Sequence, residues 1–576
     1  MTDNMSDKFL NVTEQRLAKR LSHVVGDTSM PLSTMTIPEL LSDTVSRFGA
    51  CDALICPEQE VRLTYKELAQ TVDDLAVGFL KLGLEKGDRV GIWSPNCLEW
   101  VITQFATARI GLILVNINPS YRVAELEYTL NKVECRALVM ARSFKSSNYL
   151  GMIRELAPEL ASSQPGDLRA SQLPHLRSVI VIGEPTDPGT IAFDATLVAG
   201  RTGDKEKLDS ISRTLDPDDA INIQFTSGTT GLPKGATLSH TNIVNNARFV
   251  TDRIYLTNED RLCIPVPLYH CFGMVMGVLG AVSKGAAIIL PSQAFDPVKT
   301  LQALEADSCT ALYGVPTMFV AMLQELEKEP RSLTHLRTGI MAGAPCPIEV
   351  MRRVHSQMNM SEVTICYGMT ETAPVSFQSF VDDQIDKRCE TVGRIHPHVE
   401  VKIIDSEGNT VEIGEQGEIC TRGYSVMKGY WNDPEQTAAS IENGWMHTGD
   451  LAVLDEEGFC TIVGRLKDMI IRGGENIYPR EIEEFLMRYS GVAEVQVFGV
   501  PDTHYGEEVC AWIISAPGVS VKPEEVRDFC RMQIAHYKVP KHIRIVDSLP
   551  MTVTGKPQKF IMRDKMIQYL EESTKV

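Results

Sequence analysis

The sequence predicts an α/β protein with a large N-terminal domain and a small C-terminal domain. At 576 residues the chain is longer than one hydrophobic core normally organises. Over most of its length, short β-rich runs alternate with amphipathic helical segments, which is typical of parallel sheets. After about residue 400 the pattern changes to short strands separated by glycine turns. We therefore expect two α/β subdomains and a small β-rich subdomain, followed by a small α+β domain.

The first α/β subdomain is predicted between about residues 37 and 160. There the helical segment IPELLSDTVSRF precedes strand-like runs such as DRVGIWSP and LILVNINP. Residues 161–218 contain turn-rich stretches such as GEPTDPGT, so we predict a surface connection there. The alternation resumes with runs such as AAIILP and CTALYGVP, which predict a second α/β subdomain.

The β-rich subdomain and the C-terminal domain are predicted from the last third of the chain. VEVKIID, SEGN and QGEICTRG combine strands with a turn, as in the hairpins of a small antiparallel sheet. After GRLKDMII, helical segments such as PREIEEFLMRYS alternate with strands such as EVQVFGV, and Pro479 suits a first helical turn. We therefore divide the chain into domains spanning residues 1–465 and 466–576.

The charge and the cysteine pattern exclude several classes of function. With 75 acidic and 56 basic residues, the net charge of −19 repels nucleic acids and anionic membranes. No apolar run approaches the roughly 18 residues of a transmembrane helix, and the opening segment is too polar for a signal peptide. We expect a cytoplasmic protein without nucleic-acid partners. The 14 cysteines are scattered singly, which predicts reduced, mostly buried thiols rather than disulfides or zinc ligands.

A glycine-rich segment, FTSGTTGLPKG at residues 225–235, predicts a phosphate-binding loop. Its glycines let backbone N–H groups converge, its hydroxyl groups add donors, and Lys234 supplies a positive charge. The strand-like run AINIQ precedes it, and helical spacing follows it, with Thr241 as the expected N-cap. It is not a Walker loop, because Lys234 lies between Pro233 and Gly235. Composition alone leaves an ordinary surface turn as the alternative.

Two further segments contain candidate nucleotide-binding side chains. In TICYGMTET, Thr370 and Glu371 follow Gly368, and a carboxylate beside a hydroxyl group in a glycine turn suits a magnesium ion. In WMHTGD, Asp450 is a carboxylate of the kind that accepts hydrogen bonds from ribose, and Arg465 of GRLKD offers a second contact. Taken singly, the carboxylate of Glu371 is equally well explained as a solvent-exposed group, and a lone Asp450 or Arg465 is more often a surface charge.

Taken together, five segments in this order resemble the motif set of the adenylate-forming superfamily. They are TSGTTGLPKG, YGMTE, WMHTGD, GRLKDMIIRGGENIYPREIE and PMTVTGKPQK. The resemblance covers about residues 37–570, and the runs PLYHCFG, YGVPTMF and RGYSVMKGYWNDPEQT are most similar to medium-chain fatty acyl-CoA synthetases. It implies an ATP-dependent acyl-CoA ligase. Such an enzyme first forms acyl-AMP and pyrophosphate from a carboxylic acid, and coenzyme A then displaces AMP.

The resemblance also implies the residues that bind the nucleotide. The phosphate loop would consist of Thr226, Ser227, Gly228, Thr229, Thr230, Gly231, Leu232, Pro233 and Lys234. The adenine site would consist of Gly343, Ala344, Pro345, Tyr367 and Gly368, with the tyrosine ring stacked on the base. Asp450 and Arg465 would hold the ribose.

Four residues are implied to act on the reacting groups. Lys556 would bridge the substrate carboxylate and the α-phosphate in the first step. Thr370 would contact the α-phosphate, and Glu371 would bind Mg²⁺. His270 lies where the family places a side chain beside the substrate carboxylate, with a packed core histidine as the alternative.

The second step is implied to need a rotation of a mobile C-terminal domain. Lys467 matches the hinge, and after rotation Gly473 and Gly474 would face the channel for the pantetheine arm of coenzyme A. Met274, Val275, Gly277 and Val278 would suit an apolar acyl pocket, although helix packing explains them equally well.

Three alternatives to a medium-chain acyl-CoA ligase stay open from the sequence. An aryl-CoA ligase or a luciferase-type enzyme would share the first step of the reaction. A non-catalytic nucleotide-binding protein would share only the fold. The sequence also leaves open whether the protein forms a homodimer.

Overall fold

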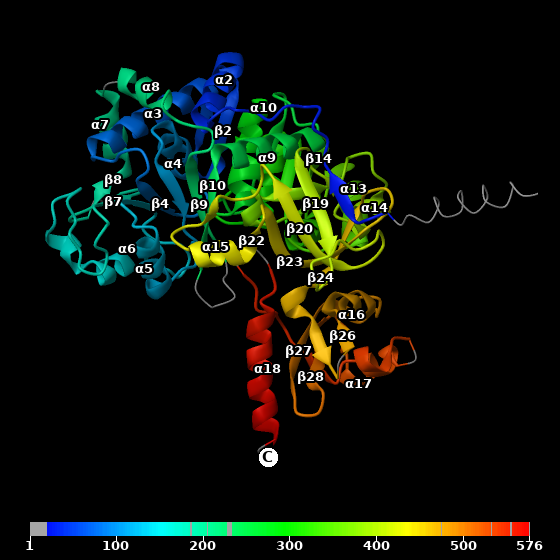
Figure 1. Ribbon diagram of the computed structural model, residues 1–576. Coiled ribbons are helices and arrows are strands. Elements are labelled where there is room, and N and C mark those ends of the chain that lie inside the picture. The colour runs from blue at the N-terminus through cyan, green and yellow to red at the C-terminus, as the bar shows by residue number, and fades with distance from the viewer. Residues whose placement is uncertain are drawn as a thin grey trace, which may run out of the picture. The chain divides into compact units, whose positions relative to one another are not determined.

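The computed structural model describes residues 20–184, 187–203, 205–226, 233–473, 475–531, 533–552 and 556–574 (Figure 1). The chain forms two compact units. The larger unit contains residues 26–399 and 421–446. The smaller unit contains, in the described part of the chain, residues 20–25, 400–420 and 447–574.

The first sheet of the larger unit confirms the predicted parallel α/β arrangement. Its described strands follow the order β21-β10-β9-β5-β4-β6-β7-β8, and those from β9 to β8 are parallel. The strands are β4 (Arg89–Trp93), β5 (Ile113–Asn116), β6 (Ala137–Met140), β7 (Ser178–Val181), β8 (Ile191–Ala192), β9 (Ala220–Thr226), β10 (Lys234–Ser239) and β21 (Gly429–Tyr430).

The prediction of a surface connection at residues 161–218 is wrong. This segment contributes β7 and β8 to the sheet, and the helices α7 (Phe193–Arg201) and α8 (Lys205–Ser212) follow. Strand β7 is only four residues long and fully buried, so it is short enough to be hidden among the turn residues around it.

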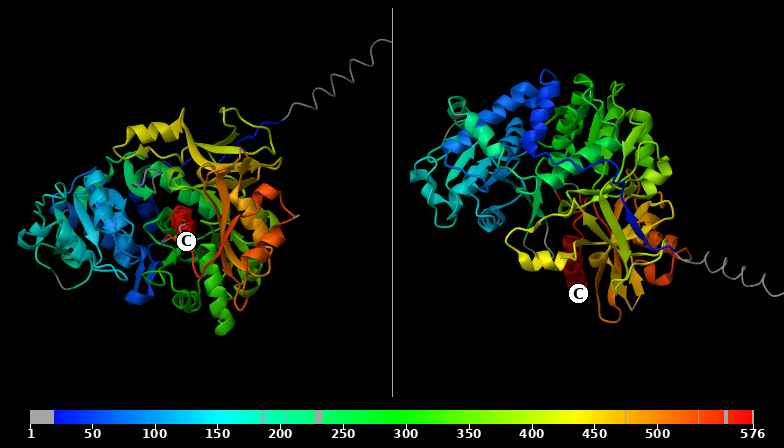
Figure 2. Two further views of the ribbon diagram at one scale, coloured as in Figure 1. Left: turned by 90° about the horizontal axis from the view of Figure 1, so that it is seen from below. Right: turned by 45° about the horizontal axis from the view of Figure 1, so that its top comes forward.

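Helices cover both faces of this sheet, as the different views show (Figure 1, Figure 2). Alternate residues of β6 belong to different hydrophobic clusters, because side chains of a strand point to opposite faces in turn. Ala137 and Val139 pack in the cluster that includes helices α3 (Tyr65–Lys81) and α4 (Leu98–Arg109). Leu138 and Met140 pack in the cluster that includes α5 (Val123–Lys132) and α6 (Tyr149–Leu156).

The second sheet of the larger unit contains the runs predicted for the second α/β subdomain, but it also contains strands from residues 52–64, which were predicted to belong to the first subdomain. Its described strands follow the order β15-β14-β13-β11-β12-β2-β3, and all neighbours except β2 and β3 are parallel. They are β2 (Asp52–Cys56), β3 (Val61–Thr64), β11 (Arg261–Cys263), β12 (Ala287–Ile289), β13 (Ala311–Gly314), β14 (Thr338–Met341) and β15 (Glu362–Thr364). A small sheet of β16 (Cys366–Gly368), β17 (Val375–Gln378) and β18 (Arg394–Ile395) follows.

The remaining helices of the larger unit have the following bounds. They are α2 (Ile37–Phe48), α9 (His240–Arg253), the π-helix η3 (Phe272–Leu279), α10 (Gly280–Lys284), α11 (Pro297–Ala306), α12 (Pro316–Lys328), α13 (Ile348–Gln357), α14 (Ile385–Glu390) and α15 (Pro434–Ser440). None of the described helices in either unit combines the length and the apolar composition that crossing a bilayer requires.

The smaller unit begins with the predicted β-rich region. Strands β1 (His23–Val25), β19 (Val399–Ile404), β20 (Gly417–Gly423) and β23 (Trp445–Leu454) are neighbours in one sheet, and β24 (Cys460–Arg465) pairs with β23. His23 of β1 lies opposite Lys402 of β19, so the first described strand pairs with a very distant part of the chain. The chain passes between the units within β19, β20 and β23.

The C-terminal part of the smaller unit has the predicted α+β composition. Its sheet contains β25 (Ile470–Arg472), β26 (Glu475–Ile477), β27 (Val492–Asp502), β28 (Gly506–Ser515) and β29 (His542–Ile545). The helices are α16 (Pro479–Leu486), which begins at the predicted proline, α17 (Pro523–Cys530) and α18 (Lys559–Thr574, red in Figure 1). The division into two compact units rests on contacts within each unit and does not show which segment rotates. The predicted domain boundary between residues 465 and 466 therefore stays a prediction.

The cysteines are mostly buried, as predicted. All 14 are free thiols, and only Cys51 and Cys389 are not buried.

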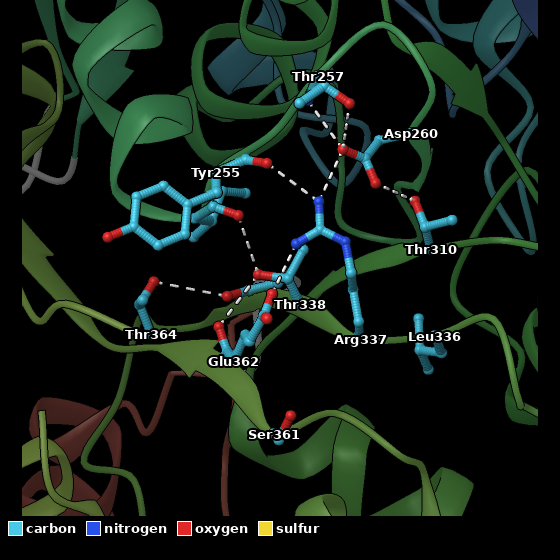
Figure 3. Close-up of polar contacts among 12 residues, drawn as sticks. Tyr255, Thr257, Asp260, Thr310, Leu336, Arg337, Thr338, Ser361, Glu362 and Thr364 are labelled. Carbon is cyan, nitrogen blue, oxygen red and sulfur yellow. Dashed lines mark hydrogen bonds and ion pairs between the residues drawn. The ribbon is translucent and has the colours of Figure 1, made fainter. Parts of the chain in front are cut away.

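An ion-pair network ties together the amino ends of four neighbouring strands in the second sheet (Figure 3). Arg337, which precedes β14, donates to Glu362 of β15 (2.6 Å) and to Asp260 before β11 (2.8 Å). Asp260 also accepts from the Thr310 hydroxyl before β13 (2.7 Å) and from the Thr257 backbone N–H (2.8 Å). The Asp260 side chain is only 5% exposed, so this carboxylate depends on these donors.

We predict that Arg337→Met lowers the stability of the larger unit by about 1–3 kcal/mol, because it removes the charged partner of a buried carboxylate. Scanning calorimetry should show a transition lowered by several degrees. The matched control is Arg353→Met, since Arg353 pairs with the exposed Glu327 (2.6 Å) and a surface pair contributes about 0–1 kcal/mol. Equal shifts in the two variants would contradict the proposed importance of Asp260 burial.

Candidate active site

The ends of the glycine-rich loop are held in a β-hairpin. Strands β9 and β10 are antiparallel, with Thr226 opposite Lys234 and Phe225 opposite Gly235. The expected order of strand, loop and helix is therefore wrong, because a second strand separates the loop from α9. The predicted N-cap is also wrong: Ser239, rather than Thr241, accepts a hydrogen bond from the Asn242 backbone N–H (3.2 Å).

Part of the predicted phosphate loop can be placed. Thr226, Pro233 and Lys234 are described, whereas Ser227, Gly228, Thr229, Thr230, Gly231 and Leu232 lie outside the described residues.

A buried carboxylate lies beside this hairpin. Glu371, in a short 3₁₀ turn at Thr370–Thr372, is only 5% exposed. Its Oε1 accepts hydrogen bonds from the Tyr430 hydroxyl (2.8 Å) and the Thr226 hydroxyl (3.1 Å). Among the described residues, both of these bonds fall on Oε1. The second oxygen, Oε2, therefore suits a cation, and the hard oxygen donor is the type that Mg²⁺ prefers.

Tyr430 links Glu371 to the lysine of the loop. Burial and the neighbouring Glu371 carboxylate raise the pKa of the Tyr430 phenol far above its ordinary value, so it stays a hydrogen-bond donor at neutral pH. The Nζ atom of Lys234 lies 4.4 Å from the centre of the Tyr430 ring, within the range of a cation–π contact. Thr226, Lys234, Glu371 and Tyr430 thus form one continuous group of contacts.

His270 and Thr370 lie on either side of Cys271. The Cys271 sulfur is 3.6 Å from Nδ1 of His270 and 3.9 Å from the Thr370 hydroxyl. The Phe272 backbone N–H, at the start of η3, donates to the same Nδ1 (3.1 Å). Because Nδ1 accepts this bond, the neutral ring carries its proton on Nε2, which makes Nε2 a donor. The partly exposed ring differs from a packed core histidine.

The predicted adenine-site residues follow β14 and belong to β16. Gly343 has a φ of +91°, which favours glycine, and Ala344 and Pro345 come directly after it. Tyr367 is half-buried on β16. A Cβ atom at Gly368 would overlap the Pro374 backbone carbonyl, at 1.7 Å, so no larger residue fits there.

The predicted ribose residues form an ion pair in the smaller unit. Asp450 and Arg465 are opposite each other on β23 and β24, and Arg465 Nε lies 2.8 Å from Asp450 Oδ1. Asp450 is only 5% exposed, whereas half of the Arg465 side chain is exposed. Lys467 follows in an exposed 3₁₀ turn at Leu466–Asp468. Gly473 has a φ of +59°, and Gly474 lies outside the described residues.

Lys556 is exposed, and its backbone is hydrogen-bonded to Thr552 shortly before α18 begins. Its N–H donates to the Thr552 hydroxyl (2.9 Å), and its carbonyl accepts from the Thr552 backbone N–H (2.8 Å). Three residues later, Lys559 forms an ion pair with Glu483 of α16 (2.7 Å). Glu483 also accepts from the Val497 backbone N–H (2.7 Å), so the start of α18 is fixed to both α16 and β27.

The four residues expected to line an acyl pocket are buried in η3. A Cβ atom at Gly277 would come within 2.8 Å of Ile264, which indicates close helix packing at that position. The Met274 sulfur accepts from the side-chain amides of Asn116 (3.1 Å) and Gln224 (3.3 Å). An acyl pocket at Met274, Val275, Gly277 and Val278 stays a prediction.

Two residues of this site were missed from the sequence. Tyr430 belongs to the GYW run, which signalled the family but no specific role, and Cys271 was one of many isolated cysteines. Their contacts with Glu371 and Thr370 join segments far apart in the chain, so sequence spacing could not reveal them.

Comparison with known proteins gives the family. The model of the AMP-binding enzymes matches residues 41–431, and the model of the AMP-binding enzyme C-terminal domain matches residues 481–556. The chain is 44% identical to the mitochondrial medium-chain acyl-CoA ligase ACSF2 of Bos taurus over 556 residues, covering 95% of this chain and 90% of the relative.

Solved structures agree with this assignment. The ATP-bound MatB of Rhodopseudomonas palustris is similar with a TM-score of 0.80 and 28% identity, over 92% of this chain and 99% of MatB. The anthranilate CoA ligase AuaEII in complex with anthranoyl-AMP is similar with a TM-score of 0.81 and 25% identity, over 93% of this chain and 98% of AuaEII. The chain therefore belongs to the AMP-binding, adenylate-forming enzymes, in the branch that contains the acyl-CoA synthetases.

Proposed function

We propose that this protein is an ATP-dependent acyl-CoA ligase that activates a medium-chain carboxylic acid. The observation that supports this most directly is the buried Glu371 carboxylate, which Tyr430 and Thr226 hold at one end of the predicted phosphate loop. Its position in the YGMTE motif and the family membership support a nucleotide as the ligand. The medium chain length proposed for the acid is supported by the relative that is named as a medium-chain acyl-CoA ligase.

In the first half-reaction, the acid attacks the α-phosphorus of ATP and pyrophosphate leaves. Negative charge accumulates at the reacting phosphate, so cations and hydrogen-bond donors dominate the stabilisation. We assign Lys234 and Thr226 to the outer phosphates, Thr370 to the α-phosphate, and Nε2 of His270 to the substrate carboxylate. Glu371 would hold Mg²⁺, which neutralises phosphate charge when bound.

The adenosine part of ATP is assigned to the remaining motif residues. Tyr367, with Gly368 beside it, would stack on adenine, which Gly343, Ala344 and Pro345 would line. Asp450 and Arg465, which form an ion pair with each other, would hold the ribose hydroxyls. Lys556 would meet the substrate carboxylate and the α-phosphate in this half-reaction.

In the second half-reaction, the thiol of coenzyme A displaces AMP. We propose that residues 466–576 rotate about Lys467 between the half-reactions, so that Gly473 and Gly474 replace Lys556 at the reacting centre. The exposed turn at Leu466–Asp468 supports this role, because a hinge must change φ and ψ without disturbing a core. Cytoplasmic location stays a prediction, and the bovine relative is named as mitochondrial. Homodimer formation stays open.

The test of the function is a panel of acids. We expect AMP release in the presence of coenzyme A, with the highest kcat/KM for octanoate or decanoate among straight-chain acids from acetate to palmitate. Benzoate and anthranilate test for an aryl-CoA ligase, and they would replace the medium-chain proposal if they were the better substrates. Absence of AMP release with every acid would support a non-catalytic nucleotide-binding protein.

For Lys556→Ala, we expect acyl-AMP formation to fall by about 100-fold or more, since a catalytic charge in a desolvated site contributes on the order of 3 kcal/mol. Thioester formation from supplied acyl-AMP should stay nearly unchanged. Acid-dependent pyrophosphate exchange and single-turnover thioester formation measure the two steps. The control is Lys565→Ala, an exposed lysine on α18. A similar loss in both steps would rule out the assigned role of Lys556.

For Glu371→Gln, we expect a higher Mg²⁺ concentration at half-maximal rate and slower acyl-AMP formation. The amide keeps the shape of the side chain and removes the charge that would hold the cation. The exposed Glu349→Gln is the matched control in the larger unit. If the Mg²⁺ dependence of Glu371→Gln equals that of the unchanged protein, Glu371 serves only to hold Tyr430 and Thr226.

A further inference from the structure

Three side chains with metal-binding atoms come together in the smaller unit. Glu418 and Cys420 lie two residues apart on β20, and His447 lies on the neighbouring strand β23. Nδ1 of His447 is 3.0 Å from Oε2 of Glu418 and 3.6 Å from the sulfur of Cys420. One donor atom from each residue lies within 4.8 Å of the other two.

The strand geometry explains this grouping. Residues two apart on a strand point to the same face, so Glu418 and Cys420 share one side of β20. The adjacent strand brings His447 to them, although 27 residues separate it from Cys420 along the chain. The cluster was therefore hidden from the sequence, where none of the spacings typical of zinc sites occurs.

The donor set fits a thiophilic divalent cation. In a tetrahedral zinc site with metal–ligand bonds of about 2.0–2.3 Å, donor atoms lie roughly 3.3–3.8 Å apart. The sulfur and the imidazole nitrogen already have this separation. A thiolate and a carboxylate together carry two negative charges, which balance a divalent cation, and the neutral imidazole completes a three-residue set.

Surrounding contacts would orient one of the ligands. The Gly449 backbone N–H donates to Oε1 of Glu418 (3.0 Å), which leaves Oε2 directed toward His447. Such hydrogen bonds to a ligating carboxylate are typical of metal sites. Cys420 is buried, while the side chains of His447 and Glu418 are 28% and 16% exposed, so an ion and a water ligand can reach the group.

We propose that Glu418, Cys420 and His447 form a binding site for a thiophilic divalent cation such as Zn²⁺. Water completes the tetrahedral coordination. This site is separate from the Mg²⁺ assigned to Glu371, because it uses sulfur and nitrogen donors and lies in the other compact unit. It does not depend on the proposed ligase activity.

The test uses the full-length protein, treated with a chelator and titrated with Co²⁺ under reducing conditions. We expect one Co²⁺ per chain with a thiolate-to-cobalt charge-transfer band, and Zn²⁺ should displace it. Cys420→Ser should abolish the band, and His447→Gln and Glu418→Gln should each weaken Co²⁺ binding at least 10-fold. Circular dichroism confirms that each variant is folded.

The matched control is Cys460→Ser. Cys460 is a buried thiol on β24 of the same sheet and is not part of this cluster, so this variant should keep the band and the affinity. If no charge-transfer band forms in the unchanged protein, Glu418 and His447 form only a hydrogen-bonded pair beside a buried thiol. If Cys420→Ser and Cys460→Ser both keep the band, another cysteine binds the ion. Either result overturns the proposal.

Discussion

The burial of one carboxylate, that of Glu371, is the constraint on which the candidate site depends. Removing a carboxylate from water costs several kcal/mol unless hydrogen-bond donors replace the solvent. Here the donors are Tyr430, on β21, and Thr226, at the end of β9. These segments must therefore be in place before the 3₁₀ turn of Glu371 is stable, which couples the arrangement of the site to the packing of the larger unit. The Glu371 carboxylate is therefore held in place by the folded larger unit before any charged ligand binds.

Much of the fold could be predicted from the sequence, and the failures have local causes. The alternation of β-rich and helical runs was sufficient to predict two parallel sheets, because buried parallel strands are short apolar runs between amphipathic helices. It did not show that residues 52–64 pair with the second sheet rather than the first. Strand β7 was missed because it is short and surrounded by turn residues. Strand β10 was missed because KGATLS contains only one β-branched residue, Thr237, and no aromatic residue, and because it pairs as the second half of a hairpin. The position of Ser239 as N-cap follows from that strand.

The site could be predicted only where a motif signals it. Glu371, Asp450, Arg465 and Lys556 were named because their surroundings resemble family motifs, since nothing in their spacing shows that they act together. Contacts that depend on strand neighbours, such as Tyr430 with Glu371 and His447 with Cys420, have no local sequence signal. They depend on which strands are adjacent, and this is a property of the whole sheet.

The pairing of β1 with β19 has a consequence for how the protein is made. The side chains of His23 and Glu400, which lie within hydrogen-bond distance at 2.7 Å, are 377 residues apart. A ribosome that adds about 5–20 residues per second needs roughly 20–75 s to synthesise the chain between them. During this interval β1 has no partner strand, while most of the larger unit emerges and can fold. The edge of β1 is then open to pairing with other chains, so the nascent protein has a defined period in which chaperone protection matters most.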